Sequence, residues 1–198
     1  MTGQDVSGTG DSGRAGRSVG LFCSAAAKLP EFMIQAAREF GAECARRRWR
    51  LVYGGSRNGL MGEAATAALA AGGDVVGVMP HFLVAREAAK RDITELHLVD
   101  TLAERKEMMI ELADIFVCLP GGIGTLDELL EVLTTNDLGR HEKPIYLCNI
   151  DGFWTPFDAM IAALAARGVM RPRGRDGYRL FADVPSLMEG VAAHFARR

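Results

Sequence analysis

Cysteine is scarce in this 198-residue sequence, and its four copies are widely separated with no Cys-x-x-Cys pair among them. Cysteines placed singly within apolar segments are typical of buried thiols in a reducing compartment, and they argue against a disulfide framework. The four histidines are equally scattered, and none has a cysteine or histidine partner at the spacing of metal ligands. We therefore expect a cytoplasmic protein without a metal site.

Long apolar runs and a strong excess of one charge are also missing. No apolar stretch approaches the roughly 20 residues needed to span a bilayer, and a formal net charge of −2 gives no broad basic surface for nucleic acid. Residues 1–17 are rich in small and polar residues and lack an apolar run, so they resemble neither a signal peptide nor a folded element. We expect a disordered leader over residues 1–17 and one folded domain over residues 18–198, with no membrane or nucleic-acid partner.

What the sequence does contain is a regular alternation of short apolar segments with helical patterns. The apolar segments fall at residues 18–23, 50–53, 74–79, 95–99, 114–118 and 144–148. This alternation predicts an α/β protein, a single-domain Rossmann-like fold with a mostly parallel sheet flanked by helices on both faces. Ligands bind such sheets beyond the carboxyl ends of the strands, so we expect a cleft there.

The most informative segment is a glycine-rich turn at residues 120–128, which joins an apolar strand to a helix. Glycine allows several backbone N–H groups to face one anion at the positively polarised start of a helix, and Thr125 adds a hydroxyl donor. The turn therefore predicts a phosphate site, with Glu128 standing beside it. The residues that would face the core on the following helix are Leu126, Leu129, Leu130 and Leu133. The alternative is that Thr125 and Glu128 form a Thr-x-x-Glu capping box that needs no ligand.

A second glycine turn at residues 51–62 again leads from an apolar strand into a helix, this time an alanine-rich one. Two such turns in one short chain suggest a shared cleft. Neither matches the dinucleotide pattern Gly-x-Gly-x-x-Gly or the Walker pattern with Gly-Lys-Ser/Thr, which disfavours NAD binding and ATP hydrolysis.

A third segment, residues 101–109, opens the helix before the strand that leads to the first turn. Thr101 and Glu104 fit a capping box, so we assign Glu104 a structural role. Arg105 and Lys106 lie early in this helix, where cations oppose the helix dipole. An anionic ligand would explain them, and so would a solvated charged face.

Taken together, Pro-Gly-Gly-Ile-Gly-Thr-Leu-Asp-Glu at 120–128 and Glu-Arg-Lys-Glu-Met-Met at 104–109 resemble the LONELY GUY (LOG) family of cytokinin riboside 5'-monophosphate phosphoribohydrolases. The resemblance runs from Ser18 to near the C-terminus and includes the second glycine turn. Members of this family were long labelled lysine decarboxylases. The resemblance implies a homodimeric enzyme that hydrolyses the N-glycosidic bond of a purine nucleoside 5'-monophosphate, N6-prenylated AMP or AMP, and needs no cofactor.

The resemblance also assigns roles by position: Arg105 and Glu128 match the family's catalytic pair. The positions that match its phosphate loop or line its nucleotide site are Glu87, Lys106, Gly121, Gly122, Gly124, Thr125 and Thr134. Cleavage of a glycosidic bond passes through a sugar with oxocarbenium character while negative charge grows on the leaving base. A carboxylate and a fixed cation meet those two needs.

Some residues differ from the family's usual sequence pattern, notably Cys23-Ser24-Ala25-Ala26, where Cys-Gly-Ser-Ser is common. Fewer hydroxyl groups at this strand end leave the base specificity open. Two other functions remain as alternatives: a nucleotide-binding or cofactor-carrier protein on the same scaffold that does not hydrolyse its ligand, and a pyridoxal-phosphate decarboxylase, for which no lysine has a recommending motif.

Overall fold

The computed structural model describes residues 17–86, 88–171, 174 and 176–197, so the predicted leader lies outside the described residues except for Arg17. The strands are β1 (Ser18–Phe22), β2 (Arg50–Tyr53), β3 (Val75–Pro80), β4 (Glu95–Val99), β5 (Ile115–Cys118), β6 (Ile145–Cys148) and β7 (Tyr178–Phe181). The α-helices are α1 (Glu31–Arg46), α2 (Gly59–Ala70), α3 (Leu102–Leu112), α4 (Ile123–Asp137), α5 (Thr155–Ala166) and α7 (Val184–Phe195). Two short 3-10 helices, η1 (His81–Leu83) and η2 (Ile150–Gly152), follow β3 and β6.

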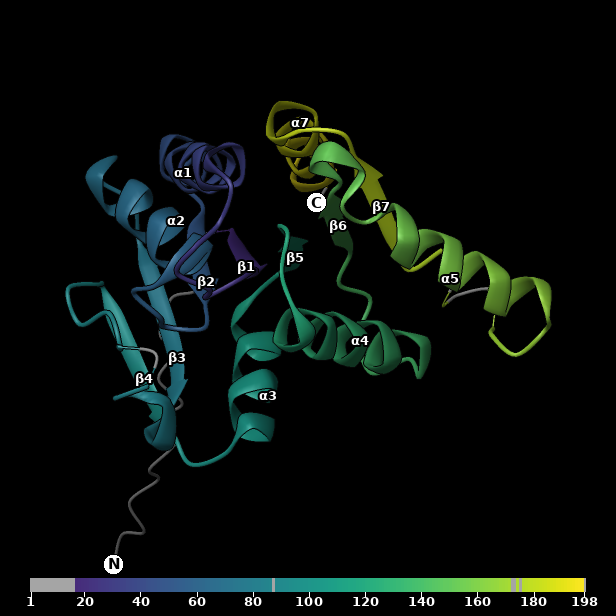
Figure 1. Ribbon diagram of the computed structural model, residues 1–198, viewed down its shortest axis with the longest axis horizontal. Helices are drawn as coiled ribbons and strands as arrows, with labels where there is room; N and C mark the ends of the chain where they lie inside the picture. Colours follow the sequence, from purple (N-terminus) through teal and green to yellow (C-terminus); the bar gives the residue numbers. More distant parts are fainter. Residues whose placement is uncertain (1–16, 87, 172–173, 175, 198) are drawn as a thin grey trace, which may run out of the picture.

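The strands form one seven-stranded sheet in the order β4-β3-β2-β1-β5-β6-β7, and every neighbouring pair is parallel. Helices α1, α2 and α7 pack on one face, and α3, α4 and α5 on the other (Figure 1). The strand order reverses direction between β1 and β5, the point at which such sheets open a crevice for a ligand. The predicted Rossmann-like fold is confirmed.

The six predicted strands are present with shifts of one residue at some ends, but β7 was not predicted. This edge strand buries Tyr178 and exposes Arg179, so its four residues lack the continuous apolar run that marks the inner strands. Edge strands are covered on fewer sides, and their sequences are correspondingly less apolar.

The stripe that helix α4 buries differs in part from the predicted one. Leu129 and Leu133 are buried as expected, but Leu130 is 42% exposed and Leu126 is partly exposed. The buried stripe instead contains the polar residues Thr125, Glu128 and Asn136. The core-facing prediction is therefore wrong for Leu130, whereas Leu126 is partly buried and packs against the core. Polar residues take part of the face that α4 turns inward.

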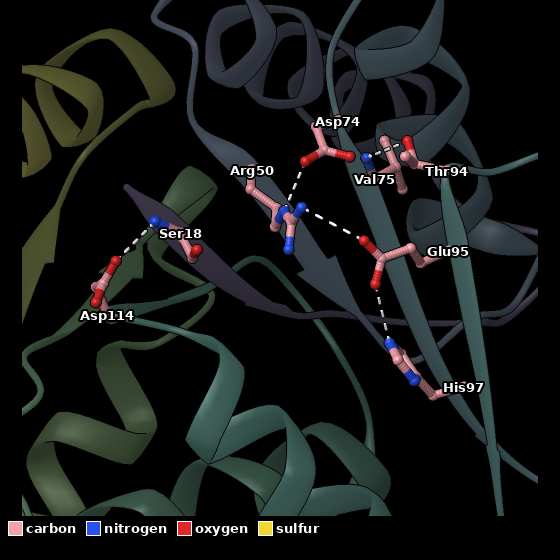
Figure 2. A network of polar contacts seen from close by, with 8 residues as sticks. All are labelled: Ser18, Arg50, Asp74, Val75, Thr94, Glu95, His97 and Asp114. Atoms are coloured by element: carbon pink, nitrogen blue, oxygen red, sulfur yellow. Dashed lines mark hydrogen bonds and ion pairs between the residues drawn. The ribbon is translucent and has the colours of Figure 1, made fainter. Parts of the chain in front are cut away.

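The amino ends of the strands are fixed by charged and polar contacts (Figure 2). Arg50 Nε at the start of β2 donates to Asp74 Oδ2 (2.6 Å), and Arg50 Nη2 donates to Glu95 Oε1 at the start of β4 (3.4 Å). The amide of Ser18 donates to Asp114 Oδ2 (2.8 Å), which links β1 to the residue before β5. These contacts hold one end of the sheet together, and the opposite end carries the cavity. Among the described residues, no helix is both long enough and apolar enough to cross a membrane.

Candidate functional site

A cavity of about 370 Å³ opens at the carboxyl ends of β1, β3 and β5. The residues that line it are Cys23, Ser24, Ala25, Met61, Phe82, Leu83, Leu102, Arg105, Lys106, Gly122, Gly124, Thr125, Asp127 and Glu128. This position is the predicted cleft at the switch point of the sheet.

The first glycine turn forms one wall of this cavity. The carbonyl of Pro120 accepts a hydrogen bond from the amide of Ser24 (3.1 Å), which ties the turn to the end of β1. Helix α4 begins directly after Gly122, its N-cap residue, and Gly122 and Gly124 line the cavity. The first N–H groups of a helix have no acceptor within the helix, so this end of α4 is suited to an anion such as phosphate.

Thr125 lies at the third position of α4 and is buried, and the N-cap makes no side-chain hydrogen bond. The capping-box interpretation of Thr125 and Glu128 is therefore wrong. Gly121 does not line the cavity, but a β-carbon there would lie 2.1 Å from Thr125 Oγ1. The missing side chain of Gly121 thus lets Thr125 approach the turn.

Arg105 and Glu128 meet inside the cavity. Arg105 Nη2 lies 3.3 Å from Glu128 Oε1, and each side chain is only 7% exposed. Within the part of the chain that is described, neither Nε nor Nη2 of Arg105 has a hydrogen-bond partner. Buried donors of a charged group are costly to leave without an acceptor, so these two are suited to a bound anion.

Helix α3 presents Arg105 to the cavity from a capped start. Thr101 Oγ1 accepts a hydrogen bond from the amide of Glu104 (3.1 Å), and Glu104 Oε2 accepts one from the amide of Asp100 (2.9 Å). The structural role assigned to Glu104 is confirmed. The pair fixes the first turn of α3, immediately before Arg105.

Lys106 lines the same cavity, but its ammonium group is engaged by two carboxylates of α4. Lys106 Nζ donates to Asp127 Oδ2 (3.0 Å) and to Glu131 Oε2 (3.0 Å). Burial by itself lowers the pKa of Lys106, but its hydrogen bonds to Asp127 and Glu131 together outweigh burial. The net pKa of Lys106 is therefore above its usual value. Lys106 is thus a protonated link between α3 and α4 at the rim of the cavity.

Besides Gly121, two predicted substrate-binding residues, Glu87 and Thr134, are not placed in this cavity. Glu87 lies outside the described residues. Thr134 is exposed on the outer side of α4 and lines a second cavity, of about 280 Å³, together with Leu138 and Val169. Arg171 lines that second cavity too.

The second glycine turn contributes less to the cavity than its sequence suggests. Among the described residues of this turn, Met61 lines the cavity. The carbonyl of Gly55 accepts a hydrogen bond from the amide of Lys90 (2.9 Å), and the amide of Arg57 donates to the carbonyl of Ala88 (3.0 Å). The turn therefore anchors the segment that follows β3 rather than forming a second phosphate loop.

Sequence reasoning missed the apolar wall of the cavity, formed by Met61, Phe82, Leu83 and Leu102. Phe82 and Leu102 are 53% and 45% exposed, large values for apolar side chains. The indication that could have found Phe82 and Leu83 is their position directly after β3, where a parallel sheet places ligand contacts.

Cys23 also lines the cavity, at the end of β1. Burial, and secondly the nearby Glu128 carboxylate, raise the pKa of the Cys23 thiol well above its usual value. The thiol is therefore neutral at physiological pH and contributes a contact rather than a nucleophile. Among the described residues, no three His, Cys, Asp or Glu side chains cluster in a way that could hold a metal ion.

Comparison with known proteins gives consistent matches. A family model described as "Possible lysine decarboxylase" matches residues 61–191. Proteins named cytokinin riboside 5'-monophosphate phosphoribohydrolase from Rhodococcoides fascians and Mycobacterium tuberculosis are each 42% identical to this chain, over 88% of it and over 89% and 93% of their own lengths. The protein of that name designated LOG from Oryza sativa is 39% identical, over 88% of this chain and 71% of its own.

Among solved structures, the molybdenum cofactor carrier protein of Chlamydomonas reinhardtii matches with a TM-score of 0.72 at 22% identity, covering 91% of this chain and 99% of that chain. The molybdenum cofactor binding protein of Rippkaea orientalis matches with a TM-score of 0.69 at 16% identity, covering 92% and 99%. At these identities the likeness shows a shared fold.

Proposed function

The chain belongs to the LONELY GUY (LOG) family of cytokinin riboside 5'-monophosphate phosphoribohydrolases, and from this premise we propose that it hydrolyses the N-glycosidic bond of a purine nucleoside 5'-monophosphate. The substrate is N6-prenylated AMP or AMP, and the products are the free base and ribose 5-phosphate. The observation that carries the proposal is the buried Arg105–Glu128 pair in one cavity with the glycine-rich start of α4.

The phosphate of the nucleotide binds at the start of α4. The N–H groups at this helix end and the hydroxyl of Thr125 are donors, and the helix dipole favours negative charge there. Gly122 and Gly124 leave open space, since a β-carbon at either position would meet no atom within 4 Å. A phosphate group can therefore approach the backbone closely.

Glu128 and Arg105 act on the two charges that develop during cleavage. The carboxylate of Glu128 stabilises the cationic sugar or activates the attacking water, as carboxylates do in glycoside hydrolysis. Arg105 is effectively always protonated, so it does not donate a proton but binds the phosphate or neutralises developing negative charge. Their burial strengthens both effects, because the surroundings have a low dielectric constant.

The apolar wall of Met61, Phe82, Leu83 and Leu102 is suited to the base end of the substrate. A purine with an apolar substituent would cover the exposed faces of Phe82 and Leu102 and remove them from water. This supports a prenylated adenine as the preferred base.

The direct test is a chromatographic assay of the purified protein with AMP, isopentenyl-AMP and CMP in parallel, scored for free base. We expect release from the two adenine nucleotides, faster from isopentenyl-AMP, and none from CMP. Binding of AMP without release of adenine would refute the hydrolase and favour the carrier function.

The decarboxylase function is disfavoured by the state of Lys106, the lysine that lines the cavity. A Schiff base forms on a neutral amine, whereas Asp127 and Glu131 hold Lys106 protonated. Incubation with pyridoxal phosphate should therefore give no visible absorbance from a Schiff base on Lys106.

We also propose that the protein is a homodimer of the reducing cytoplasm. Leu130 on helix α4 is 42% exposed, and Leu138, the residue directly after this helix, is 61% exposed. Val169, which lines the second cavity with them, is 69% exposed. Apolar surface of this kind is usually covered in an assembly. A second copy on this face would also cover Thr134, and the four cysteines are buried free thiols, as suits a reducing compartment.

A further inference from the structure

Gly54, the residue after β2, lies directly against the guanidinium group of Arg105. A β-carbon on Gly54 would stand 1.8 Å from Arg105 Nη2 and 2.9 Å from Arg105 Cζ. Backbone conformation does not require glycine here, since the residues of this turn with positive φ are Gly55 (77°) and Gly59 (56°). The reason for glycine at position 54 is therefore space.

Arg105 is held in place by packing rather than by a network of hydrogen bonds. Among the described residues, its Nε and Nη2 have no hydrogen-bond partner, and Nη2 forms a 3.3 Å ion pair with Glu128. The Nη2 atom of the guanidinium group is thus close to both the backbone of Gly54 and the carboxylate of Glu128. Any atom added at Gly54 would occupy the place that Nη2 now holds.

We propose that Gly54 is a positioning residue for the reaction: its missing side chain sets the place of the Arg105 guanidinium group beside Glu128 and the phosphate-binding turn. The inference rests on the proposed function of the same site and adds to it a residue that does not itself line the cavity. It also gives the second glycine turn a part in the chemistry, through Arg105 rather than through contact with phosphate.

The proposal predicts that stability and activity respond differently to one added methyl group. The atom that a Gly54→Ala methyl would displace is the far end of a flexible side chain, so the fold can adjust at little cost. The reaction does not tolerate the same shift, because a catalytic group misplaced by about 1 Å can lower the rate by up to about 100-fold. Gly54→Ala should therefore stay folded and lose about 10- to 100-fold in kcat/KM for AMP.

A double-mutant cycle with Arg105→Lys separates this effect from a general disturbance. Lysine keeps the charge but lacks the Nη2 atom that the new methyl would meet, so Gly54→Ala should cost less than about threefold in that background. Gly190→Ala is the matched control, because its β-carbon would stand 2.4 Å from Cζ of Phe181, and neither residue lines the cavity. It should lower Tm and leave kcat/KM unchanged. Equal losses from Gly54→Ala in the wild-type and Arg105→Lys backgrounds would overturn the proposal.

Crystal structures of the wild type and Gly54→Ala test the same proposal without using activity. The expected result is an Arg105 guanidinium group displaced by about 1 Å or more from Glu128, and an unchanged position would overturn the inference. A wild-type protein that binds AMP but releases no adenine would refute the proposed function, and the position of Arg105 in the two structures would still decide the role of Gly54.

Discussion

Glu128 is the residue on which the proposed chemistry depends most. Replacing it with glutamine keeps the size of the side chain and removes the negative charge, so the cationic sugar loses its counter-charge and water loses its base. We expect Glu128→Gln to lower kcat by about 100-fold or more. AMP should still bind, because the proposed phosphate contacts lie at the start of α4. Chromatographic base release and calorimetric AMP titration measure the two effects separately.

The matched control for this substitution is Glu107→Gln, an exposed glutamate on α3 outside the cavity. It removes one carboxylate from the neighbouring helix and should leave base release unchanged. Full activity of Glu128→Gln would remove Glu128 from the mechanism. Loss of cooperative unfolding in that variant would show that the buried carboxylate is structural instead.

The cysteines should be unreactive in the folded protein. All four are buried, and burial raises the pKa of Cys148 to about 12 and those of Cys23, Cys44 and Cys118 above their usual value. A raised pKa means that the thiols stay protonated at pH 8, where the reactive species is the thiolate. An aromatic disulfide reagent should therefore release almost no thiolate dye from the native protein and four equivalents in denaturing urea. Rapid reaction of one thiol in the native state would contradict this.

At the scale of single elements, the capped start of α3 gives a stability prediction. Thr101→Ala removes the acceptor for the amide of Glu104, and loss of such a cap costs about 1 kcal/mol of the free energy of unfolding. The urea midpoint should fall accordingly, whereas Thr101→Ser keeps a hydroxyl acceptor and should stay close to the wild type. An alanine variant as stable as the wild type would show that the cap does not hold the helix.

Helix α4 shows why an element can be predicted from sequence while its orientation cannot. The leucine spacing correctly indicated a helix after the glycine turn, but it assigned Leu130 to the core. That rule assumes that polar residues face water, and here Thr125, Glu128 and Asn136 are buried. The family resemblance gave Glu128 a role, yet hydrophobic periodicity alone would place it outside the core.

For the whole molecule, the order of strands and helices was enough to predict the sheet and the end at which the cavity lies. Parallel β-α units place every loop after a strand at the same edge, so the glycine turn had to meet Cys23 and the residues after β3 there. The order of the elements does not predict which side chains of distant elements contact one another. Neither the approach of Gly54 to Arg105 nor the link from Lys106 to Glu131 follows from spacing along the chain.

The exposed apolar residues near α4 lead to a prediction about the proposed homodimer. Leu138 directly follows α4, is 61% exposed and lines the second cavity together with Val169, so a dimer that covers this face would bury both. Leu138→Asp would place a charge in that interface, where it has no partner, and should shift the protein toward monomer at micromolar concentration. Light scattering coupled to gel filtration measures the mass directly.

The control for this substitution is Phe32→Asp, which changes an apolar residue of α1 that is 44% exposed on the opposite face of the sheet. It should remain dimeric, and dissociation of Phe32→Asp with a dimeric Leu138→Asp would place the interface on α1 instead. Thr134 lies on the same side of α4 as Leu138. If the resemblance places it correctly at the nucleotide site, the site is completed by the second copy, and Leu138→Asp should lose base release in parallel with the dimer.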